Sequence, residues 1–384
     1  MSIDLVERVR ERLARGSRDT PAITAAAVAG AVRAEAGGLV GHTDLLDALT
    51  RLRQEFVGAG PLDPLLRDPT TTDVLVTAPD QVWVDGAAGL RRTEVRFPDE
   101  DAVRRLAQRL AMSAGRRLDD AQPYVDGWLR SGAHIRLHAV LPPVAEHTCL
   151  SLRVLRPAAH GLADLRALGM FDDEIHEVLS AIVAARLAFL ISGGTGAGKT
   201  TLLAALLGCV PHEERIVCVE DAGELEPRHP QFVRLIARPP NIEGAGEVSL
   251  RDLVRQGLRM RPDRLVVGEM RGAEVVELLA SLNTGHDGGA GTVHANSPAE
   301  VPARLEALAA LGGLSRAALH SQLAAAIHVV VHVRRVPRRA VSQIGVLART
   351  SEGARVDPVW TDGVWTPHRG DLVSLLRSRG VEVP

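Results

Sequence analysis

The chain has 384 residues, more than a single hydrophobic core usually organises, so we expect two or three domains. Its formal net charge is −2 and only 3% of its residues are aromatic, so it lacks the basic excess and the base-stacking side chains of a typical nucleic-acid-binding protein. The three cysteines form no Cys-x-x-Cys pair, which disfavours a zinc module or a disulfide framework and favours a reducing compartment.

Nothing in the sequence predicts a membrane span. The first residues, Met1-Ser2-Ile3-Asp4, do not begin a secretory signal. The most apolar run, residues 181–191, is interrupted by Arg186 and is too short to cross a bilayer. We therefore expect a cytoplasmic protein whose association with any membrane is peripheral.

The N-terminal part of the chain predicts a helical extension followed by a small α+β domain. Residues 1–57 carry apolar side chains at helical spacing, beginning with Leu5, Val9 and Leu13, and show no chemistry of their own. Gly60-Pro61 ends this pattern, and residues 58–157 then alternate as strands around one helix. The expected strands are 73–77, 81–85, 134–140 and 149–155, and the expected helix is 101–112. Residues 158–165 predict a linker.

The remaining residues, 166–384, predict an α/β domain with a C-terminal tail. Apolar strands alternate with longer helices, a rhythm that indicates a parallel, doubly wound sheet with its ligands at the carboxyl ends of the strands. The expected strands are 187–192, 215–220, 232–236 and 265–267, with a helix over 200–207. The basic run 334–339 in the tail is more typical of a solvated turn than of a binding patch.

Lys199 is the only lysine among 45 basic side chains, and the other 44 are arginine. A lysine that survives such a bias marks a position where a planar guanidinium would not fit between phosphate groups. It lies in a G-x-x-x-x-G-K-T phosphate loop, which predicts binding of ATP by backbone amides, by the lysine and by the start of a helix. The expected ATP-binding residues are Gly193, Gly194, Thr195, Gly196, Ala197, Gly198, Lys199, Thr200 and Thr201.

Two acidic segments follow predicted strands and are candidates for catalysis and metal binding. Glu269 comes after the strand at 265–267, and a carboxylate there can polarise the water that attacks a γ-phosphate. Gly268 stands where many phosphate-loop enzymes carry the aspartate that supports Mg²⁺. We therefore expect Mg²⁺ to be held by the Thr200 hydroxyl together with a second acidic group, through water, from Glu220, Asp221 and Glu224.

Two histidines, His286 and His294, lie eight residues apart across a glycine-rich stretch. No third ligand stands at a spacing that zinc sites use. Neutral imidazoles are better suited to sensing a γ-phosphate or to coupling it to motion, so we expect both to lie at the nucleotide.

These motifs, in this order, resemble the type II/type IV secretion ATPase superfamily, and most closely its tight-adherence (Flp pilus) assembly branch, the CpaF-like ATPases. The resemblance extends from about Gly60 to Val333. The chain lacks the tetracysteine module of the pilus-extension branch. The segments that carry it are 60–66, 193–201, 220–224, 238–244, 251–255, 260–264, 268–271 and 283–296.

The resemblance implies a RecA-like ATPase domain with a smaller N-terminal domain, assembled as a homo-hexamer on an inner-membrane pilus or secretion platform. It implies that residues 220–224 are the Asp box, Gly268-Glu269 an atypical Walker B motif, and His286 with His294 the His box. It further implies that Arg136 and Arg153 of the N-terminal domain close on the phosphates. Taken alone, both arginines are more typical of structural residues at strand edges.

The predicted activity is Mg²⁺-dependent ATP hydrolysis that moves a pilus-assembly platform at the inner face of the plasma membrane. Within the family, a conjugative or effector type IV secretion ATPase is the alternative. A RecA-like nucleic-acid translocase is a rival from another class, and salt-sensitive stimulation by DNA would support it. A nucleotide-binding scaffold without turnover is a third possibility, disfavoured by Lys199 and Glu269.

Overall fold

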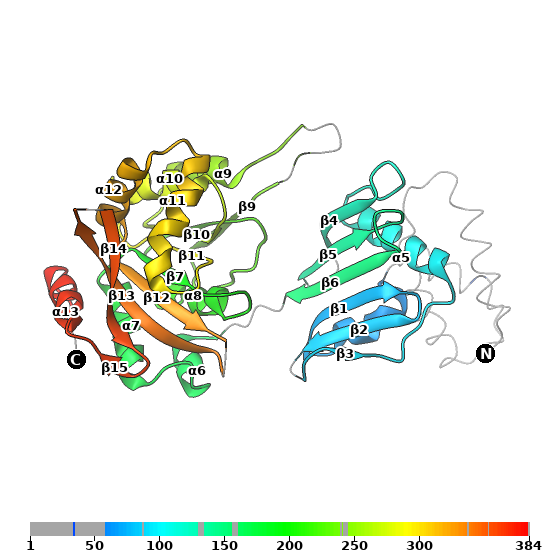
Figure 1. Cartoon of the computed structure of the whole chain (residues 1–384), viewed down its shortest axis with the longest axis horizontal. Coiled ribbons are helices and arrows are strands. Elements are labelled where there is room, and N and C mark those ends of the chain that lie inside the picture. Colours follow the sequence, from blue (N-terminus) through cyan, green and yellow to red (C-terminus); the bar gives the residue numbers. More distant parts are fainter. Residues whose placement is uncertain are drawn as a thin grey trace. The chain divides into compact units, whose positions relative to one another are not determined.

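The computed structural model divides the chain into two compact units, Met1–Arg156 and Pro157–Pro384 (Figure 1). The residues it describes are 34, 58–86, 88–129, 134–155, 160–238, 240, 245–335, 338–351 and 353–382. Apart from residue 34, the helical extension predicted over 1–57 lies outside these residues. Most of the segment 238–244, quoted for the family resemblance, lies outside them as well.

The N-terminal unit is built on a six-stranded antiparallel sheet with the order β3-β2-β1-β6-β5-β4. Its strands are β1 (Thr71–Ala78), β2 (Gln81–Gly86), β3 (Arg91–Arg92), β4 (Tyr124–Leu129), β5 (His134–Val140) and β6 (Cys149–Leu155). A 3₁₀ turn (Gly60–Leu62), α4 (Asp63–Arg67) and α5 (Glu100–Ser113) complete it. Asp99 caps α5 by accepting a hydrogen bond from the Ala102 amide, and the helix buries Val103, Leu106 and Leu110 in the core.

The sequence pattern predicted α5 and four of these six strands but missed the two-residue β3 and the longer β4. The inward positions of β4 are Val125, Gly127 and Leu129, all buried. Gly127 breaks the apolar alternation because its missing side chain makes room for Ala114, whose Cβ would lie 3.0 Å from a Cβ placed on the glycine. Close packing of the Ala114 and Arg116 side chains against Gly127 thus removed the signal that identifies a strand.

The second unit contains a nine-stranded sheet with the order β15-β14-β13-β12-β7-β11-β10-β8-β9. Its strands are β7 (Phe189–Ser192), β8 (Ile216–Glu220), β9 (Phe232–Ile236), β10 (Arg264–Met270), β11 (Ala290–Val293), β12 (Val329–Arg334), β13 (Ala340–Thr350), β14 (Gly353–Thr361) and β15 (Val364–Trp365). The predicted parallel sheet is confirmed for six neighbouring strands, which are β12, β7, β11, β10, β8 and β9 in sheet order. The expected tail instead extends the sheet, because β13, β14 and β15 pair antiparallel.

Helices cover both faces of this sheet (Figure 1). One core contains Phe189 and Ile191 of β7 with residues of α6, α7, α8 and α13, and the other contains Leu190 with residues of α9 to α12. Consecutive residues of β7 therefore point into opposite cores, which explains why the strand is apolar throughout. The helices are α6 (Leu162–Ala167), α7 (Asp173–Ala184), α8 (Lys199–Leu207), α9 (Leu250–Gly257), α10 (Glu274–Leu282), α11 (Val301–Leu311), α12 (Arg316–Ala326) and α13 (Arg369–Ser378).

Two details of this unit differ from the sequence prediction. Helix α6 begins at Leu162, inside the expected linker 158–165. The glycine-rich stretch 284–296 contains a buried central strand, β11, and does not form one continuous loop. Gly291 is required there by close packing, since a Cβ on it would lie 2.9 Å from the Val267 carbonyl oxygen. Among the described helices, none is long and apolar enough to cross a membrane.

Candidate nucleotide site

The phosphate loop connects β7 to α8 at the carboxyl edge of the sheet. Gly193, Gly196 and Gly198 have φ angles of 151°, 70° and 103°, which favour glycine. Gly193 is also required by space, since a Cβ on it would lie 2.3 Å from the Val333 carbonyl oxygen of β12. Residues Gly194 to Gly196 are exposed. The loop therefore has its base fixed by the neighbouring strand and its tip open to solvent.

Lys199 begins α8 and is buried, with 7% of its surface exposed. Its ammonium donates hydrogen bonds to the carbonyl oxygens of Gly193 (2.9 Å) and Gly194 (2.8 Å). It also lies 3.4 Å from Nδ1 of His294. Burial lowers the pKa of Lys199, and the nearby charge of Glu269 partly opposes this. A buried cation whose hydrogen-bond partners are neutral is one that an anionic ligand would stabilise.

Glu269 lies near the end of β10 and faces two basic side chains. His294 Nε2 is 2.7 Å from one carboxylate oxygen, Oε1, and Arg271 Nη2 donates to the other, Oε2, at 2.5 Å. Burial raises the pKa of Glu269, but the hydrogen bond and charge of Arg271, together with His294 and Lys199, hold it below its ordinary value. Glu269 is therefore ionised at neutral pH and able to act as a hydrogen-bond acceptor.

His294 follows β11 directly and links Lys199 to Glu269. A carboxylate oxygen cannot donate, so the proton of the 2.7 Å contact with Glu269 belongs to Nε2. Nδ1 is then the acceptor that faces the ammonium of Lys199. Burial lowers the pKa of His294, and the charge of Lys199 lowers it further. The imidazole is thus neutral at neutral pH, with a tautomer assigned from its partners.

These residues fit a nucleoside triphosphate. The exposed loop tip presents backbone amides, α8 directs its N-terminus at the loop, and Thr200 stands beside Lys199 where its hydroxyl can ligate Mg²⁺. Glu269 Oε1 is buried beside His294 Nε2, and a carboxylate oxygen has two lone pairs, so it can accept a second hydrogen bond from a water molecule. Across those residues, no group of three or more His, Cys, Asp and Glu side chains converges to hold a metal.

Glu220, at the end of β8, is bonded within its own part of the fold. It is 4% exposed, and its Oε1 accepts hydrogen bonds from the backbone amides of Glu224 (3.0 Å) and Leu225 (2.9 Å). Its Oε2 lies 3.3 Å from Arg234 Nε. Burial raises the pKa of Glu220 to about 7, although these amides and Arg234 lower it. Glu220 therefore holds the turn that follows β8 through Oε1, and water-mediated support of Mg²⁺ by Glu220, Asp221 and Glu224 stays a prediction.

Asp221 lies on the nucleotide side of that turn. It is exposed, and its carboxylate is 3.7 Å from Arg271 Nη1, so Arg271 stands between Asp221 and Glu269. The structure thus connects the acidic turn after β8 with the candidate base on β10 through one arginine.

The two histidines do not meet. His286 precedes β11 and His294 follows it, and β11 is parallel to β7, so His286 lies at the opposite edge of the sheet from the phosphate loop. His286 Nδ1 is 3.3 Å from the Ser281 carbonyl oxygen, near the end of α10. The expectation that His286 binds the nucleotide of its own chain is therefore not met in this structure.

Arg136 and Arg153 are cross-strand partners on β5 and β6 of the N-terminal unit. Arg136 donates to both carboxylate oxygens of Asp126 at 3.0 and 2.7 Å, and Arg153 donates to Asp73 at 2.9 Å. These ion pairs hold both guanidinium groups on one face of the sheet. Their role at a nucleotide stays a prediction from the family resemblance.

Residues outside the sequence motifs also contact the phosphate loop and the strand that leads into it. Ser192 Oγ lies 2.9 Å from His332 Nδ1 on β12, and Arg339 donates to the Gly196 carbonyl oxygen at 3.1 Å. The run of arginines at 334–339 was visible in the sequence and was interpreted as a solvated turn. Only the pairing of β12 with β7 places it beside the loop.

Comparisons with known proteins identify the family of this chain. Residues 55–357 match the family described as type II/IV secretion system protein. A Mycobacterium tuberculosis protein named for conjugal transfer is 62% identical over 349 residues, which cover 89% of this chain and 99% of that protein. The type IV secretion system protein PtlH of Bordetella pertussis is 30% identical over 337 residues, covering 80% and 95%.

Among solved structures, the pilus retraction motor PilT with bound ADP aligns with a TM-score of 0.54 at 20% identity, covering 83% of this chain and 85% of that chain. The Legionella pneumophila ATPase DotB aligns at 0.52 and 19%, covering 76% and 80%. At these identities the likeness shows a shared RecA-like fold. The family match and the two relatives together show that this chain belongs to the type II/IV secretion system protein family.

Proposed function

We propose that this chain is a Mg²⁺-dependent ATPase that powers a pilus-assembly or secretion machine. One observation carries the proposal: the buried Lys199 of the phosphate loop is connected through His294 to the ionised carboxylate of Glu269. A cation for the phosphates and an acceptor for the attacking water therefore belong to one site, as ATP hydrolysis requires. Membership of the secretion ATPase family supports the same activity.

The residues divide the chemistry as follows. The loop amides and Lys199 bind the β- and γ-phosphates, with Lys199 giving up its contacts with the Gly193 and Gly194 carbonyls to do so. Bound Mg²⁺, ligated by Thr200, would neutralise charge on the phosphate oxygens. Glu269 accepts a hydrogen bond from the attacking water and orients it in line with the leaving group. Arg136 and Arg153 would neutralise the charge that develops when the N-terminal unit closes.

For the machine, the order of the motifs favours a Flp (tight-adherence) pilus, with the ATPase acting as a homo-hexamer on an inner-membrane platform. The second candidate is a conjugative or effector type IV secretion system, because relatives are named for conjugal transfer and type IV secretion. In either case we expect a cytoplasmic protein bound peripherally at the inner face of the membrane. The net charge of −2 supports a protein partner over nucleic acid.

The activity is tested with the purified chain, by measuring Mg²⁺-ATP hydrolysis against protein concentration while particle mass is recorded. Specific activity that rises as a six-subunit species forms supports a ring motor, and activity of the monomer at every concentration contradicts it. Glu269→Gln should bind ATP normally and hydrolyse it about 100- to 10,000-fold more slowly. Normal hydrolysis by Glu269→Gln would show that a different residue orients the water.

The machine is tested in the source cell by deleting the gene and restoring either the wild-type protein or Glu269→Gln. Loss of surface pili with normal conjugation frequency supports the Flp assignment. Loss of conjugation or protein secretion with intact pili supports the second candidate. Stimulation of ATPase activity by DNA that disappears at high salt would favour a nucleic-acid translocase over both.

A further inference from the structure

The turn between β12 and β13 brings basic side chains to the outer side of the phosphate loop. Arg339 Nε donates a hydrogen bond to the Gly196 carbonyl oxygen at 3.1 Å. A Cβ placed on Gly196 would lie 3.5 Å from Arg335 Nη1, and one on Gly198 would lie 3.9 Å from Arg339 Cδ. Arg339 therefore bonds the exposed tip of the loop, and Arg335 lies beside the same tip.

A third arginine of the same turn reaches the segment that supports the loop. A Cβ placed on Gly169 would lie 3.3 Å from Arg338 Nη1, and the next residue, Met170, packs toward Gly198. The Val341 amide of β13 donates to the Met170 carbonyl oxygen at 2.9 Å. The two strands that flank the turn therefore pack beside the phosphate loop, β12 at Gly193 and β13 at Met170.

The charges of these three arginines are not neutralised by the described part of the protein. Arg334, at the end of β12, pairs with Asp362 at 2.7 Å. Arg335, Arg338 and Arg339 are exposed, and none has a carboxylate within ion-pair distance among the described residues. Exposed cations placed beside a phosphate site raise the local concentration of anions and speed their association.

We propose that Arg335, Arg338 and Arg339 form a basic rim of the nucleotide site, in which Arg339 also holds the phosphate loop through the Gly196 carbonyl. The ligand class is a nucleoside di- or triphosphate, so the inference rests on the proposed ATPase function. Within it, the charge of the rim attracts the polyphosphate, and the Arg339 bond keeps the loop in its binding conformation. Arg339 is a positioning residue for the loop, and the rim determines how fast nucleotide binds.

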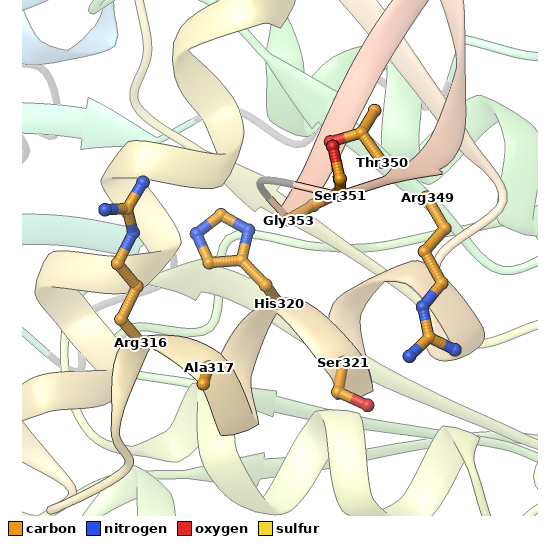
Figure 2. Close-up of a pocket in the computed structure, with 8 residues that line it drawn as sticks. All are labelled: Arg316, Ala317, His320, Ser321, Arg349, Thr350, Ser351 and Gly353. Atoms are coloured by element: carbon orange, nitrogen blue, oxygen red, sulfur yellow. The ribbon is translucent and has the colours of Figure 1, made fainter.

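A matched control exists at the other end of β13. Arg349 is exposed and, among the described residues, has no carboxylate within ion-pair distance. It lines a pocket of about 400 Å³ between α12 and the β13–β14 turn (Figure 2). Nine residues of strand separate it from the rim, which is about 30 Å. Arg349→Gln therefore removes one arginine charge at the far end of β13, without touching the phosphate loop.

The experiment measures association and dissociation of a ribose-labelled fluorescent ATP and the corresponding ADP by stopped flow, at several salt concentrations. Arg335→Gln should slow association of both nucleotides about three- to tenfold at low ionic strength, and the difference should disappear near 0.5 M salt. Arg349→Gln should match the wild type. Thermal melting of each variant separates these effects from a loss of folded protein.

Two variants at Arg339 separate its charge from its hydrogen bond. Arg339→Gln should slow association and also speed dissociation, about tenfold, because a charge and the loop contact are both lost. Arg339→Lys keeps the charge but lacks the Nε donor, so it should restore the association rate while dissociation stays fast. Association rates that are equal in the wild type, Arg335→Gln and Arg339→Gln would overturn the rim. A wild-type chain that binds neither nucleotide would overturn both the rim and the proposed ATPase function.

Discussion

A Cβ atom placed on Gly268 would lie 2.7 Å from Cγ of Glu220, so the Glu220 side chain occupies the space that any side chain at position 268 would need. The two residues stand on adjacent strands, β10 and β8. This contact explains why glycine replaces the aspartate that other phosphate-loop enzymes use at this place. It also accounts for the burial of Glu220, whose carboxylate accepts hydrogen bonds from the turn after β8.

Gly268→Ala should lower the free energy of unfolding by about 1–3 kcal/mol, because Glu220 must move out of a packed position to admit the new methyl group. Chemical denaturation at neutral pH measures the change. Gly370→Ala in α13 is the matched control, since a Cβ there meets no atom within 4 Å. That control should be neutral or slightly stabilising. A Gly268→Ala protein as stable as the wild type would show that Glu220 is free to move.

Glu220 should make the protein less stable as pH rises from about 4.5 to about 7. Its pKa is raised from 4.5 to about 7 in the folded protein, chiefly by burial, so the folded state holds this proton more tightly than the unfolded state does. The stabilisation is fully present below the pKa of the unfolded chain and is lost as the pH rises through the pKa of the folded protein. It amounts to at most about 3 kcal/mol. Comparing the unfolding free energies of Glu220→Gln and the wild type across this range isolates it. Parallel curves for the two proteins would refute the assignment.

Lys199→Arg should abolish ATP binding nearly as fully as Lys199→Ala does. The ammonium lies within 2.9 Å of two loop carbonyls in a buried space, and a planar guanidinium cannot enter it without displacing the loop. Equilibrium binding of labelled ATP should weaken at least about 100-fold in both variants. Wild-type affinity in Lys199→Arg would show that steric fit does not explain why this position carries the single lysine of the chain.

ATP hydrolysis should be insensitive to pH through 6.5 and decline only below it, owing to His294. Its pKa is lowered from 6.5 by burial and by the charge of Lys199, so the imidazole stays neutral to a lower pH than an exposed histidine. Protonation would then remove the Nδ1 acceptor and place a second cation beside Lys199. His294→Gln should hydrolyse ATP about tenfold more slowly and lose this acidic limb. A decline centred above pH 6.5 would contradict the lowered pKa.

The central strands and the phosphate loop could be predicted because their signals are local. A phosphate loop is one continuous segment, and its glycines, Lys199 and Thr200 are specified by their spacing alone. Strands β7, β8 and β9 are bounded by turns and could be identified from their short apolar runs. The same reasoning failed for β4 and β11, where glycines replace core side chains: the Ala114 side chain fills the space at Gly127, and the Val267 carbonyl fills it at Gly291.

The sequence by itself therefore determined the phosphate loop, the candidate carboxylate Glu269 and the α/β character of the domain, since each depends on residues that are neighbours in the chain. Only the tertiary structure decided that His294 joins Lys199 while His286 does not, that Glu220 serves the fold, and that the arginines after β12 stand at the loop. The order of strands in the sheet determines which of these residues lie together. That order results from packing both faces of a sheet at once, which no local pattern records.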